Sequence, residues 1–477
     1  MILAILVLLP ALAGLALWPQ RRLDTHLIGL IAVSSLHLVG VGLLWAGLGG
    51  GAFGSVLRLD PTGLIFLSIT SLLLFLTSLY TVPYLRYGTH DPQAAPHRFV
   101  PCLLWFLSSL TLVAATQQLA LLWVAVEATT LATAPLVYFY RRRGALEATW
   151  KYLLLCSVGI ALALLGTFFL GISGSAVSPT PGLSLPSLIH AAPQLSHPWL
   201  KAAFILALVG YGTKMGLAPL HAWLPDTHSQ APSPVSALLS GALLNGALLA
   251  LLRFYQVALA SGNGDFARTL LLVLGFVSLI VACAFLVGQR DYKRLLAYSS
   301  IENMGIIAVG IALGGGGAFG ALFHALNHSL SKAGLFYCAG NVLRRYGSTN
   351  VADVRGILRR QPATGVLLIL LFLAIGGMPP FGAFWSKLLI FQAAAHQSVG
   401  LATFFLALVA IAFLGMAGVL LPMLQGNPDP TRLPSRDHRL SLVPPMMALA
   451  GVLLLGLYLP PALAATLRHA AALLGDK

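Results

Sequence analysis

The sequence predicts an all-α, polytopic membrane protein with about fourteen transmembrane helices, and three observations lead to this fold class. Of the 477 residues, 58% are apolar and only 9% are charged, whereas about 25% of the residues in an ordinary soluble domain are charged. Apolar runs long enough to cross a bilayer recur along the whole chain. Lys and Arg are concentrated in alternate loops between these runs. A soluble globule, a disordered chain and a secreted disulfide scaffold are therefore excluded.

A transmembrane helix requires roughly 20 mostly apolar residues, and this criterion places the predicted spans along the chain. The first span has no basic residue in front of its apolar run, so we interpret it as a membrane helix and not as a cleavable signal peptide. The predicted spans are 2–18, 26–48, 62–85, 98–116, 119–140, 146–173, 201–222, 232–256, 267–288, 294–314, 317–343, 363–391, 398–424 and 441–465.

The charges between the spans predict the orientation of the chain. The odd-numbered loops contain eighteen Lys and Arg residues, and the even-numbered loops contain three, namely Arg58, Lys201 and Arg268. Because cytoplasmic loops are enriched in Lys and Arg, we expect both termini on the outer side. This topology explains most of the net charge of +15. The basic residues form no aromatic-rich patch, so nucleic acid is not an expected partner.

The sequence predicts a single integral membrane domain over residues 1–477. The longest polar connections, 174–200 and 425–440, are rich in Pro, Gly and Ser and too short to fold alone. No phosphate-binding or dinucleotide-binding motif is present, and no HExxH motif, so we expect no cofactor on this chain. The four cysteines lie singly in apolar runs, which gives no support for a disulfide or a metal site.

Ionisable residues inside predicted spans are the main functional candidates, because a charge near the bilayer centre costs several kcal/mol. Glu127 lies midway along the fifth span and Lys214 lies at a similar depth in the seventh. We expect the two side chains to form a charged pair. The alternative is a structural carboxylate that only bonds a neighbouring helix.

Two spans contain residues that break helices. In the seventh, Pro219 follows three glycines, and in the twelfth, Pro379 and Pro380 precede Lys387. Broken helices at membrane depth are typical of ion-coupled transporters, although a proline kink beside a snorkelling lysine is the alternative for Lys214. Two breaks five spans apart predict two inverted five-helix repeats, spans 4–8 (98–256) and spans 9–13 (267–424), with Lys387 as the counterpart of Lys214.

His324, His328 and Lys332 are spaced four residues apart, so on a helix they form one polar stripe. Imidazole exchanges protons near neutral pH, and this row therefore predicts a proton path. A metal site and a structural polar seam are the alternatives. No carboxylate or thiol follows at ligand spacing, so no metal is expected.

Four further residues are supporting candidates. Glu302 is in the tenth span, where transport and an ion pair with Lys293 or Arg294 are equally open interpretations. His221 and Asp226, with His228, belong to the seventh loop, as a proton mouth or a cap on the next helix. Lys151 forms an i,i+4 pair with Glu147 and is a candidate for tuning Glu127.

Five segments in order carry a resemblance to a known family: WVAVEATT, GTKMGLAPLHAWLPDTHSQAPSPVSALLSG, DYKRLLAYSSIENMG, HALNHSLSKAGLF and GMPPFGAFWSK. Over roughly residues 100–395 the chain resembles the antiporter-like proton-channel subunits of respiratory complex I, the multisubunit cation/proton antiporters and the group 4 hydrogenases. ALEATWKYLLLCSVGIALALLG and the IENMG segment are most similar to the hydrogenase-4 component F type, found in formate hydrogenlyase-like complexes.

The resemblance implies roles for the candidate residues. Separation of Glu127 from Lys214 would gate a half-channel, the row from His324 to Lys332 would be the central relay, and Lys387 would be the terminal site. Where many relatives carry a Lys or His in the eighth span, this chain has Asn245, which cannot hold a charge. Water ordered by Asn245 or Ser240 would have to bridge that gap.

The resemblance also implies the setting in which the chain works. It would be a proton-translocating subunit, with sodium as an alternative ion, of a redox-driven complex in the bacterial cytoplasmic (inner) membrane. Its partners would be other membrane subunits, through them a peripheral redox arm, and membrane lipid. A subunit of a multisubunit sodium/proton antiporter and a non-conducting scaffold are the alternative functions. The chain itself would carry out no redox chemistry.

Overall fold

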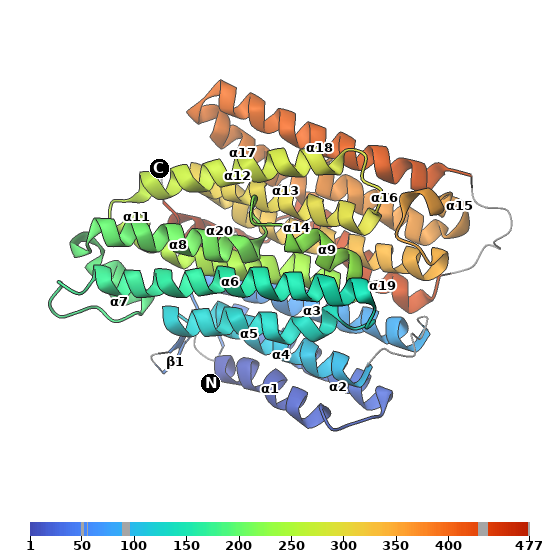
Figure 1. Cartoon of the computed structure of the whole chain (residues 1–477), viewed down its shortest axis with the longest axis horizontal. Coiled ribbons are helices and arrows are strands. Elements are labelled where there is room, and N and C mark those ends of the chain that lie inside the picture. Colours follow the sequence, from blue (N-terminus) through green and yellow to red (C-terminus); the bar gives the residue numbers. More distant parts are fainter. Residues whose placement is uncertain (49–51, 55, 88–95, 428–436, 476–477) are drawn as a thin grey trace.

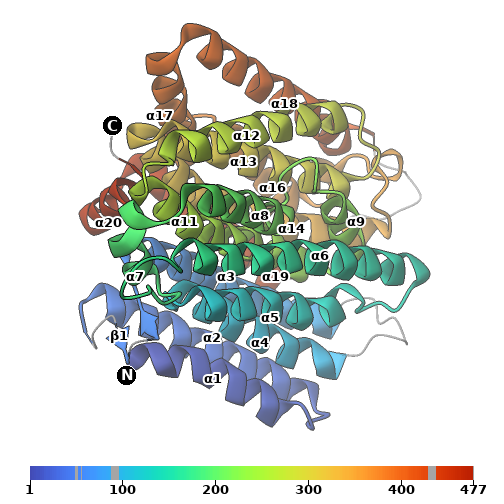
Figure 2. The ribbon, with the colours of Figure 1, turned by 60° about the vertical axis from the view of Figure 1, so that its left-hand side comes forward.

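The computed structural model describes residues 1–48, 52–54, 56–87, 96–427 and 437–475. Over these residues the chain is a bundle of long helices with one short strand pair (Figure 1). Helix α1 begins and helix α20 ends at the same end of the bundle (Figures 1 and 2). This placement is what an even number of membrane crossings requires.

Each of the fourteen predicted spans overlaps at least one helix, which confirms the polytopic all-α fold. These are α1 (Ile2–Leu17), α2 (Leu23–Trp45), α3 (Pro61–Tyr87), α4 (Pro96–Ala115), α5 (Leu119–Val137), α6 (Arg143–Ser173), α8 (His197–Met215) with α9 (Trp223–Gln230), α10 (Ser233–Leu238) with the π-helical η2 (Leu239–Leu243) and α11 (Leu244–Ala260), α12 (Gly264–Leu286), α13 (Tyr292–Leu313), α14 (Gly315–Tyr346), α16 (Pro362–Gly376) with α17 (Gly382–Gln397), α18 (Val399–Gln425) and α19 (Arg439–Leu457). Ten helices in the described ranges are long and apolar enough to cross a membrane by themselves.

The remaining elements are short, and several were not predicted. They are β1 (Ala52–Phe53), β2 (Leu57–Arg58), α7 (Leu185–Ala191), η1 (Ala192–Gln194), η3 (Val351–Asp353), α15 (Ile357–Arg360) and α20 (Pro461–Ala472). The prediction of one last span over 441–465 was wrong, because α19 ends at Leu457 and α20 begins at Pro461. Pro460 and Pro461 both lack the amide that a continuous helix needs. Arg432 and Arg436 of the charge pattern lie outside the described residues.

The centre of the bundle consists of α10–α11, α13 and α14. The apolar windows of α10–α11 and of α13 are fully buried, whereas only 28% of the window of α19 is buried. Helix α14 packs against α10, α13, α16, α17 and α19. A side chain on α14 therefore meets both the first and the second half of the chain, which is the position that a central relay requires.

Both predicted helix breaks are present, and they share one backbone geometry. Helix α8 is followed by Gly216 with φ 81°, and α16 is followed by Gly377 with φ 89°. Three backbone hydrogen bonds recur at corresponding positions of the two breaks. In the first break they join Gly216 N to Thr213 O, Leu217 N to Gly212 O and Leu220 N to Leu217 O. In the second break they join Gly377 N to Ala374 O, Met378 N to Leu373 O and Phe381 N to Met378 O. The two breaks are thus the same local motif.

The predicted equivalence of Lys214 and Lys387 is wrong at the level of single residues. Lys214 precedes its break, whereas Lys387 follows its break. When the two motifs are superposed by residue order, Lys214 corresponds to Ile375 and Lys387 corresponds to Asp226. The sequence pattern located both breaks but did not define which half-helix carries the charge.

Glycines allow two helix pairs to approach closely. A Cβ on Gly210 of α8 would lie 2.5 Å from the carbonyl oxygen of Gly159 on α6, and a Cβ on Gly305 of α13 would lie 2.8 Å from that of Gly275 on α12. Small residues at helix interfaces let backbones pack tightly in membrane proteins. These contacts fix α8 and α13, which carry Lys214 and Glu302.

We predict that Gly210→Ala destabilises the protein, because the added methyl group meets backbone that cannot yield cheaply. Overpacking of this kind costs roughly 1–3 kcal/mol. The measurement is the apparent melting temperature of the purified, detergent-solubilised protein. Gly42→Ala on α2 is the control, since its Cβ would meet nothing within 4 Å. Equal melting temperatures for the two variants would contradict the prediction.

Candidate functional site

The six predicted translocation residues lie on four interior helices. Five of them are buried, and Glu127 is half-buried. Glu127 is on α5, Lys214 on α8, the row of His324, His328 and Lys332 on α14, and Lys387 on α17.

Glu127 and Lys214 are joined through Thr130 and not by a direct ion pair. The Lys214 ammonium donates to the Thr130 hydroxyl at 2.5 Å and to the carbonyl oxygen of Val126. The Thr130 hydroxyl donates in turn to Glu127 Oε2 at 3.2 Å, and Ser157 donates to Oε1 at 2.9 Å. No direct ion pair between the two predicted partners occurs in the described part of the chain. The expected pair is therefore a charge–hydroxyl–charge arrangement, because Thr130 lies one helical turn after Glu127.

The α14 row is present and buried, and its members have different surroundings. The Lys332 ammonium donates to the carbonyl oxygen of Leu296 at 2.6 Å. His328 is fully buried, and neither ring nitrogen has a hydrogen-bond partner among the described residues. Buried polar atoms normally have a partner, so both nitrogens of His328 are available to exchange a proton with a group or water that enters the row.

His324 is held so that its ring can be neutral or protonated. Asn303 Nδ2 donates to the carbonyl oxygen of Ser299 at 2.6 Å, so Asn303 Oδ1 accepts from His324 Nε2 at 2.8 Å. His324 Nδ1 is 2.8 Å from Ser386 Oγ, which also lies 3.0 Å from the carbonyl oxygen of Ala383. The Ser386 hydroxyl can donate to a neutral ring, or accept from a protonated ring while donating to Ala383. We infer this tautomer from the partners of Asn303.

Lys387 lies against the break between α16 and α17. Its ammonium donates to the carbonyl oxygens of Ile375 at 3.0 Å and Gly376 at 3.3 Å. It also forms an ion pair with Glu302 Oε1 at 3.6 Å. Of the two open interpretations of Glu302, the ion pair with Lys293 or Arg294 is therefore wrong, because Glu302 pairs with Lys387 on α17.

Asn245 connects the eighth span to α14 directly. Its Nδ2 donates to Ser329 Oγ and to the carbonyl oxygen of Gly241, both at 2.7 Å. Its Oδ1 is buried and has no partner among the described residues. The hydroxyl oxygens of Ser240 and Ser300 are 2.8 Å apart. The π-helical turn at Leu239–Leu243 places these polar groups beside the row.

The remaining supporting residues lie near one end of the bundle. Asp226 is on α9 and not in a loop, and it pairs with Lys151 at 3.0 Å and with Arg294 at 3.1 Å. Lys151 also pairs with Glu147 at 2.6 Å, and no bond joins it to Glu127 within the described ranges. The interpretation that Lys151 tunes Glu127 has no contact to support it. Asp226, Lys151, Glu147 and Arg294 instead line a cavity of about 390 Å³.

The two histidines near this end differ in their surroundings. The His221 ring is partly buried and lies 6.3 Å from the Tyr298 ring. The His228 ring is fully buried and stacked 4.9 Å from Phe336. His228 is therefore packed in the bundle rather than placed at an open mouth.

Sequence reasoning missed several buried polar residues. Arg253 of the eighth span is fully buried and donates to both carboxylate oxygens of Asp60, at 2.6 and 2.7 Å. Burial favours a raised pKa for Asp60, but the adjacent guanidinium outweighs it and holds the pKa below its ordinary value. His37 bonds to Ser71 at 2.9 Å and to Thr111 at 3.0 Å. In both cases the sequence contained a signal, namely an ionisable residue, Arg253 or His37, inside a predicted span.

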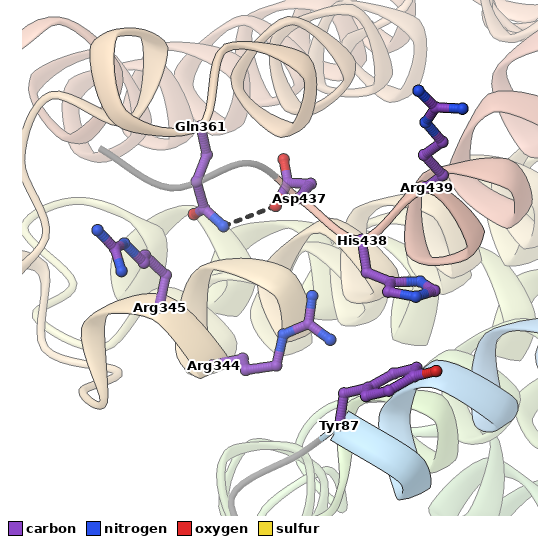
Figure 3. Close-up of a pocket in the computed structure, with 7 residues that line it drawn as sticks. All are labelled: Tyr87, Arg344, Arg345, Gln361, Asp437, His438 and Arg439. Carbon is purple, nitrogen blue, oxygen red and sulfur yellow. Dashed lines mark hydrogen bonds between the residues drawn. The ribbon is translucent and has the colours of Figure 1, made fainter. Parts of the chain in front are cut away.

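A second, larger cavity of about 720 Å³ opens where α3 and α14 end and where α16 and α19 begin (Figure 3). Gln361 donates to Asp437 at 2.7 Å across it. Its lining contains Tyr87, Arg344, Arg345, Gln361, Asp437, His438 and Arg439, and none of the predicted translocation residues. The arginines here belong to the odd-numbered loops, so this cavity reflects the charge asymmetry of the bundle and is separate from the buried row.

A metal site requires several ligand side chains close together. Within the described ranges, no group of three or more His, Cys, Asp or Glu side chains is arranged to hold a metal ion.

Buried ionisable groups in a bundle with two broken helices are typical of ion-coupled membrane proteins, and the comparisons with known proteins identify the family. The chain matches the family model described as NADH:quinone oxidoreductase/Mrp antiporter, TM, over residues 116–415. It belongs to this family of antiporter-like membrane subunits, which confirms the resemblance drawn from the sequence motifs.

One relative and two solved structures illustrate the match. The hydrogenase-4 component F homolog of Methylacidiphilum infernorum (isolate V4) is 36% identical over 435 residues, which cover 88% of this chain and 89% of the relative. A chain of respiratory complex I from Thermus thermophilus with bound aureothin matches with a TM-score of 0.79 and 28% identity, over 96% of this chain and 97% of that chain. A chain of the Mrp complex from Dietzia sp. matches in fold, with a TM-score of 0.87 and 20% identity over 99% and 97% of the two chains.

We predict that Thr130→Val destabilises the protein, because Lys214 and Glu127 each lose a hydrogen-bond partner. Leaving buried polar groups without a partner costs about 1–3 kcal/mol. Thr130→Ser keeps the hydroxyl and is the control, with a melting temperature near that of the wild type. A valine variant as stable as the serine variant would show that Thr130 does not join the two charges.

Proposed function

We propose that the chain is the proton-translocating subunit of a redox-driven membrane complex of the group 4 hydrogenase or complex I type. The observation that carries this proposal is the buried series of ionisable side chains from α5 to α17, each with hydrogen-bond partners or an open position for one. Ionisable groups are expensive inside a bilayer. A chain that only supported its neighbours would not need six of them, three of which lie on α14 at the bundle centre.

The gate in this proposal is the Glu127–Thr130–Lys214 arrangement. Two opposite charges separated by one hydroxyl group, roughly 5 Å apart, attract by about 3 kcal/mol at an effective dielectric constant of 20. Movement of Glu127 away from Lys214 removes this attraction and leaves an ammonium in a dry site, which favours proton release. Thr130 and Ser157 supply the hydroxyl groups that hold Glu127 in the paired state.

The route from the gate leads to Lys332 and then along α14 to His328 and His324. Ser240 lies on η2, which packs on α14, and Asn245 bonds Ser329 of α14. The free Oδ1 of Asn245 can orient a water molecule that extends the row toward the gate. Ser386 and Asn303 then connect His324 to the vicinity of Lys387. Lys387 is the terminal site at the second helix break.

The proposed entry is the cavity lined by Asp226 and Lys151. A polar cavity of about 390 Å³ at the end of α9 can hold the water from which a proton is taken. Asp226 forms an ion pair with Arg294, and Lys151 forms one with Glu147. These ion pairs at the cavity favour a proton mouth over the alternative of a helix cap.

The proposed setting follows from the relatives and from the charges. Hydrogenase-4 and complex I, in the names of the relatives, are multisubunit assemblies, so we infer membrane partners and a peripheral redox arm. The location would be the bacterial cytoplasmic membrane, with the Arg-rich loops inside and both termini outside. Protons are the proposed ion, because imidazoles form the centre of the row.

The inverted repeats 98–256 and 267–424 are part of the proposal. The shared backbone hydrogen bonds at the two breaks support them. In this arrangement each repeat contributes one broken helix, and α14 of the second repeat carries the row that lies between the breaks.

We predict that Glu127→Gln leaves the complex assembled but reduces redox-driven proton translocation at least tenfold, because the amide keeps the shape and loses the charge that holds Lys214. The measurement is acidification in proteoliposomes that contain the intact complex, with assembly verified. Wild-type translocation by the variant would refute the gate.

We predict that Lys332→Ala impairs translocation more than His324→Ala. Water can replace an imidazole in a proton chain, but it cannot supply the titrating positive charge to which the neighbouring sites respond. The same vesicle assay compares the two variants. Equal and mild losses would remove Lys332 from the central role.

A further inference from the structure

Glu302 is a buried carboxylate whose charge partner is Lys387. The residue is 4% exposed, and its Oε1 lies 3.6 Å from the Lys387 ammonium. Its Oε2 accepts from Ser299 Oγ and Asn303 Nδ2, both at 3.4 Å. These hydrogen bonds are long and come from neutral donors, so the ammonium is the principal group that compensates the buried negative charge.

Lys387 has a second anchor that is independent of Glu302. Its ammonium donates to Ile375 and Gly376, the last carbonyls of α16. The carbonyl end of a helix carries partial negative charge. Gly377 leaves room for the Lys387 side chain, because a Cβ there would lie 3.0 Å from Lys387 Cδ. The Lys387 amino group therefore stays in place when its charge changes. Its electrostatic attraction to Glu302, in contrast, is lost when the amino group becomes neutral.

The pair is connected to the central row on both sides. Asn303 follows Glu302 and accepts from His324 Nε2, and Ser386 precedes Lys387 and bonds His324 Nδ1. The His324 ring thus lies between the neighbours of both charged residues. A change in the charge of Glu302 or Lys387 can therefore affect His324 through Asn303 on one side of the ring and through Ser386 on the other.

This pair lies on the two spans of the second half that correspond to the spans of the gate in the first half, although its lysine is on the other side of the helix break. Glu127 and Lys214 are on the fifth and seventh spans, and Glu302 and Lys387 are on the tenth and twelfth. In each case a carboxylate on an unbroken helix faces an amino group beside a broken helix. Thr130 separates the first pair, whereas the second pair is in direct contact.

We propose that Glu302 is the positioning residue of a second gate, which holds the proton on Lys387 until it is released at the exit. This inference rests on the proposed function and adds a carboxylate to its terminal site. In the release step an Nζ–H bond of Lys387 breaks, the electron pair stays on Nζ, and the proton forms an O–H bond with water. Glu302 forms and breaks no bond in this step and acts through its contact with Lys387.

The test compares Glu302→Gln and Glu302→Asp in the intact complex in proteoliposomes. Glutamine keeps the size and the hydrogen-bond acceptor, whereas aspartate keeps the charge on a shorter side chain. We expect glutamine to reduce redox-driven proton translocation at least tenfold and aspartate to recover a measurable part. Asp265→Asn on α12 is the matched control, because that carboxylate is 91% exposed, and it should translocate as the wild type does.

A double variant separates a paired role from an independent one. Glu302→Gln combined with Lys387→Met should be no worse than Lys387→Met alone, since the carboxylate acts only through the lysine. If Glu302→Gln fails to assemble, the double variant should assemble better, because removing both charges leaves neither unpaired. A double variant that translocates or assembles less well than both single variants would overturn the proposal.

Glu127→Gln in the same assay distinguishes this inference from the proposed function. Loss of translocation in Glu127→Gln with wild-type translocation in Glu302→Gln would overturn the second gate and leave the first. Wild-type translocation in both variants would overturn the proposed function itself. An aspartate variant no better than the glutamine variant would assign Glu302 a role in shape and overturn the positioning role.

Discussion

The arrangement depends on one interaction, the hydrogen bond from each buried lysine to a main-chain carbonyl. Lys214 donates to Val126, Lys332 to Leu296 and Lys387 to Ile375, and Lys293 likewise donates to Ala231. A carbonyl is a neutral acceptor that can bond an ammonium or an amine. A lysine held only by a tight carboxylate pair would be fixed in its charged form. The carbonyls keep each amino group in position through a change of charge, and the carboxylates can then set which form is favoured.

Helix breaks and glycine contacts help to provide this interaction inside a membrane. The end of α16 leaves the carbonyls of Ile375 and Gly376 open to Lys387. Lys214 and Lys332 instead bond carbonyls inside the unbroken helices α5 and α13. The close contact of Gly210 with α6 fixes the end of α8 at which Lys214 lies. Burial of α13 and α14 keeps the row away from lipid. The fold thus supplies polar groups at membrane depth without exposing backbone to the bilayer.

The sequence predicts this fold well because the bilayer imposes its spans locally. Apolar run length located all fourteen helices, and proline with glycine located both breaks, since each signal lies within about 20 residues. The charged residues were found for the same reason, because a charge is conspicuous in an apolar run. Their partners could not be found in this way. Thr130 and Ser386 are ordinary residues of apolar helices, and the partner of Glu302 is on another span, so only the packing of distant spans reveals their roles.

The hydroxyl groups of Thr130 and Ser386 let the hydrogen bonds of the proposed route adapt to a change of charge. The charged residues alone could not provide this. Thr130 accepts from Lys214 while it donates to Glu127, and Ser386 can donate to His324 or to the carbonyl oxygen of Ala383. A hydroxyl group reverses its direction by rotating one bond, which costs far less than moving a buried charge. Each hydroxyl lies next to a group proposed to gain or lose a proton. The neighbouring polar atoms therefore remain hydrogen-bonded in either protonation state. The cost of an unpaired buried group is avoided both at the gate and at the His324 end of the row.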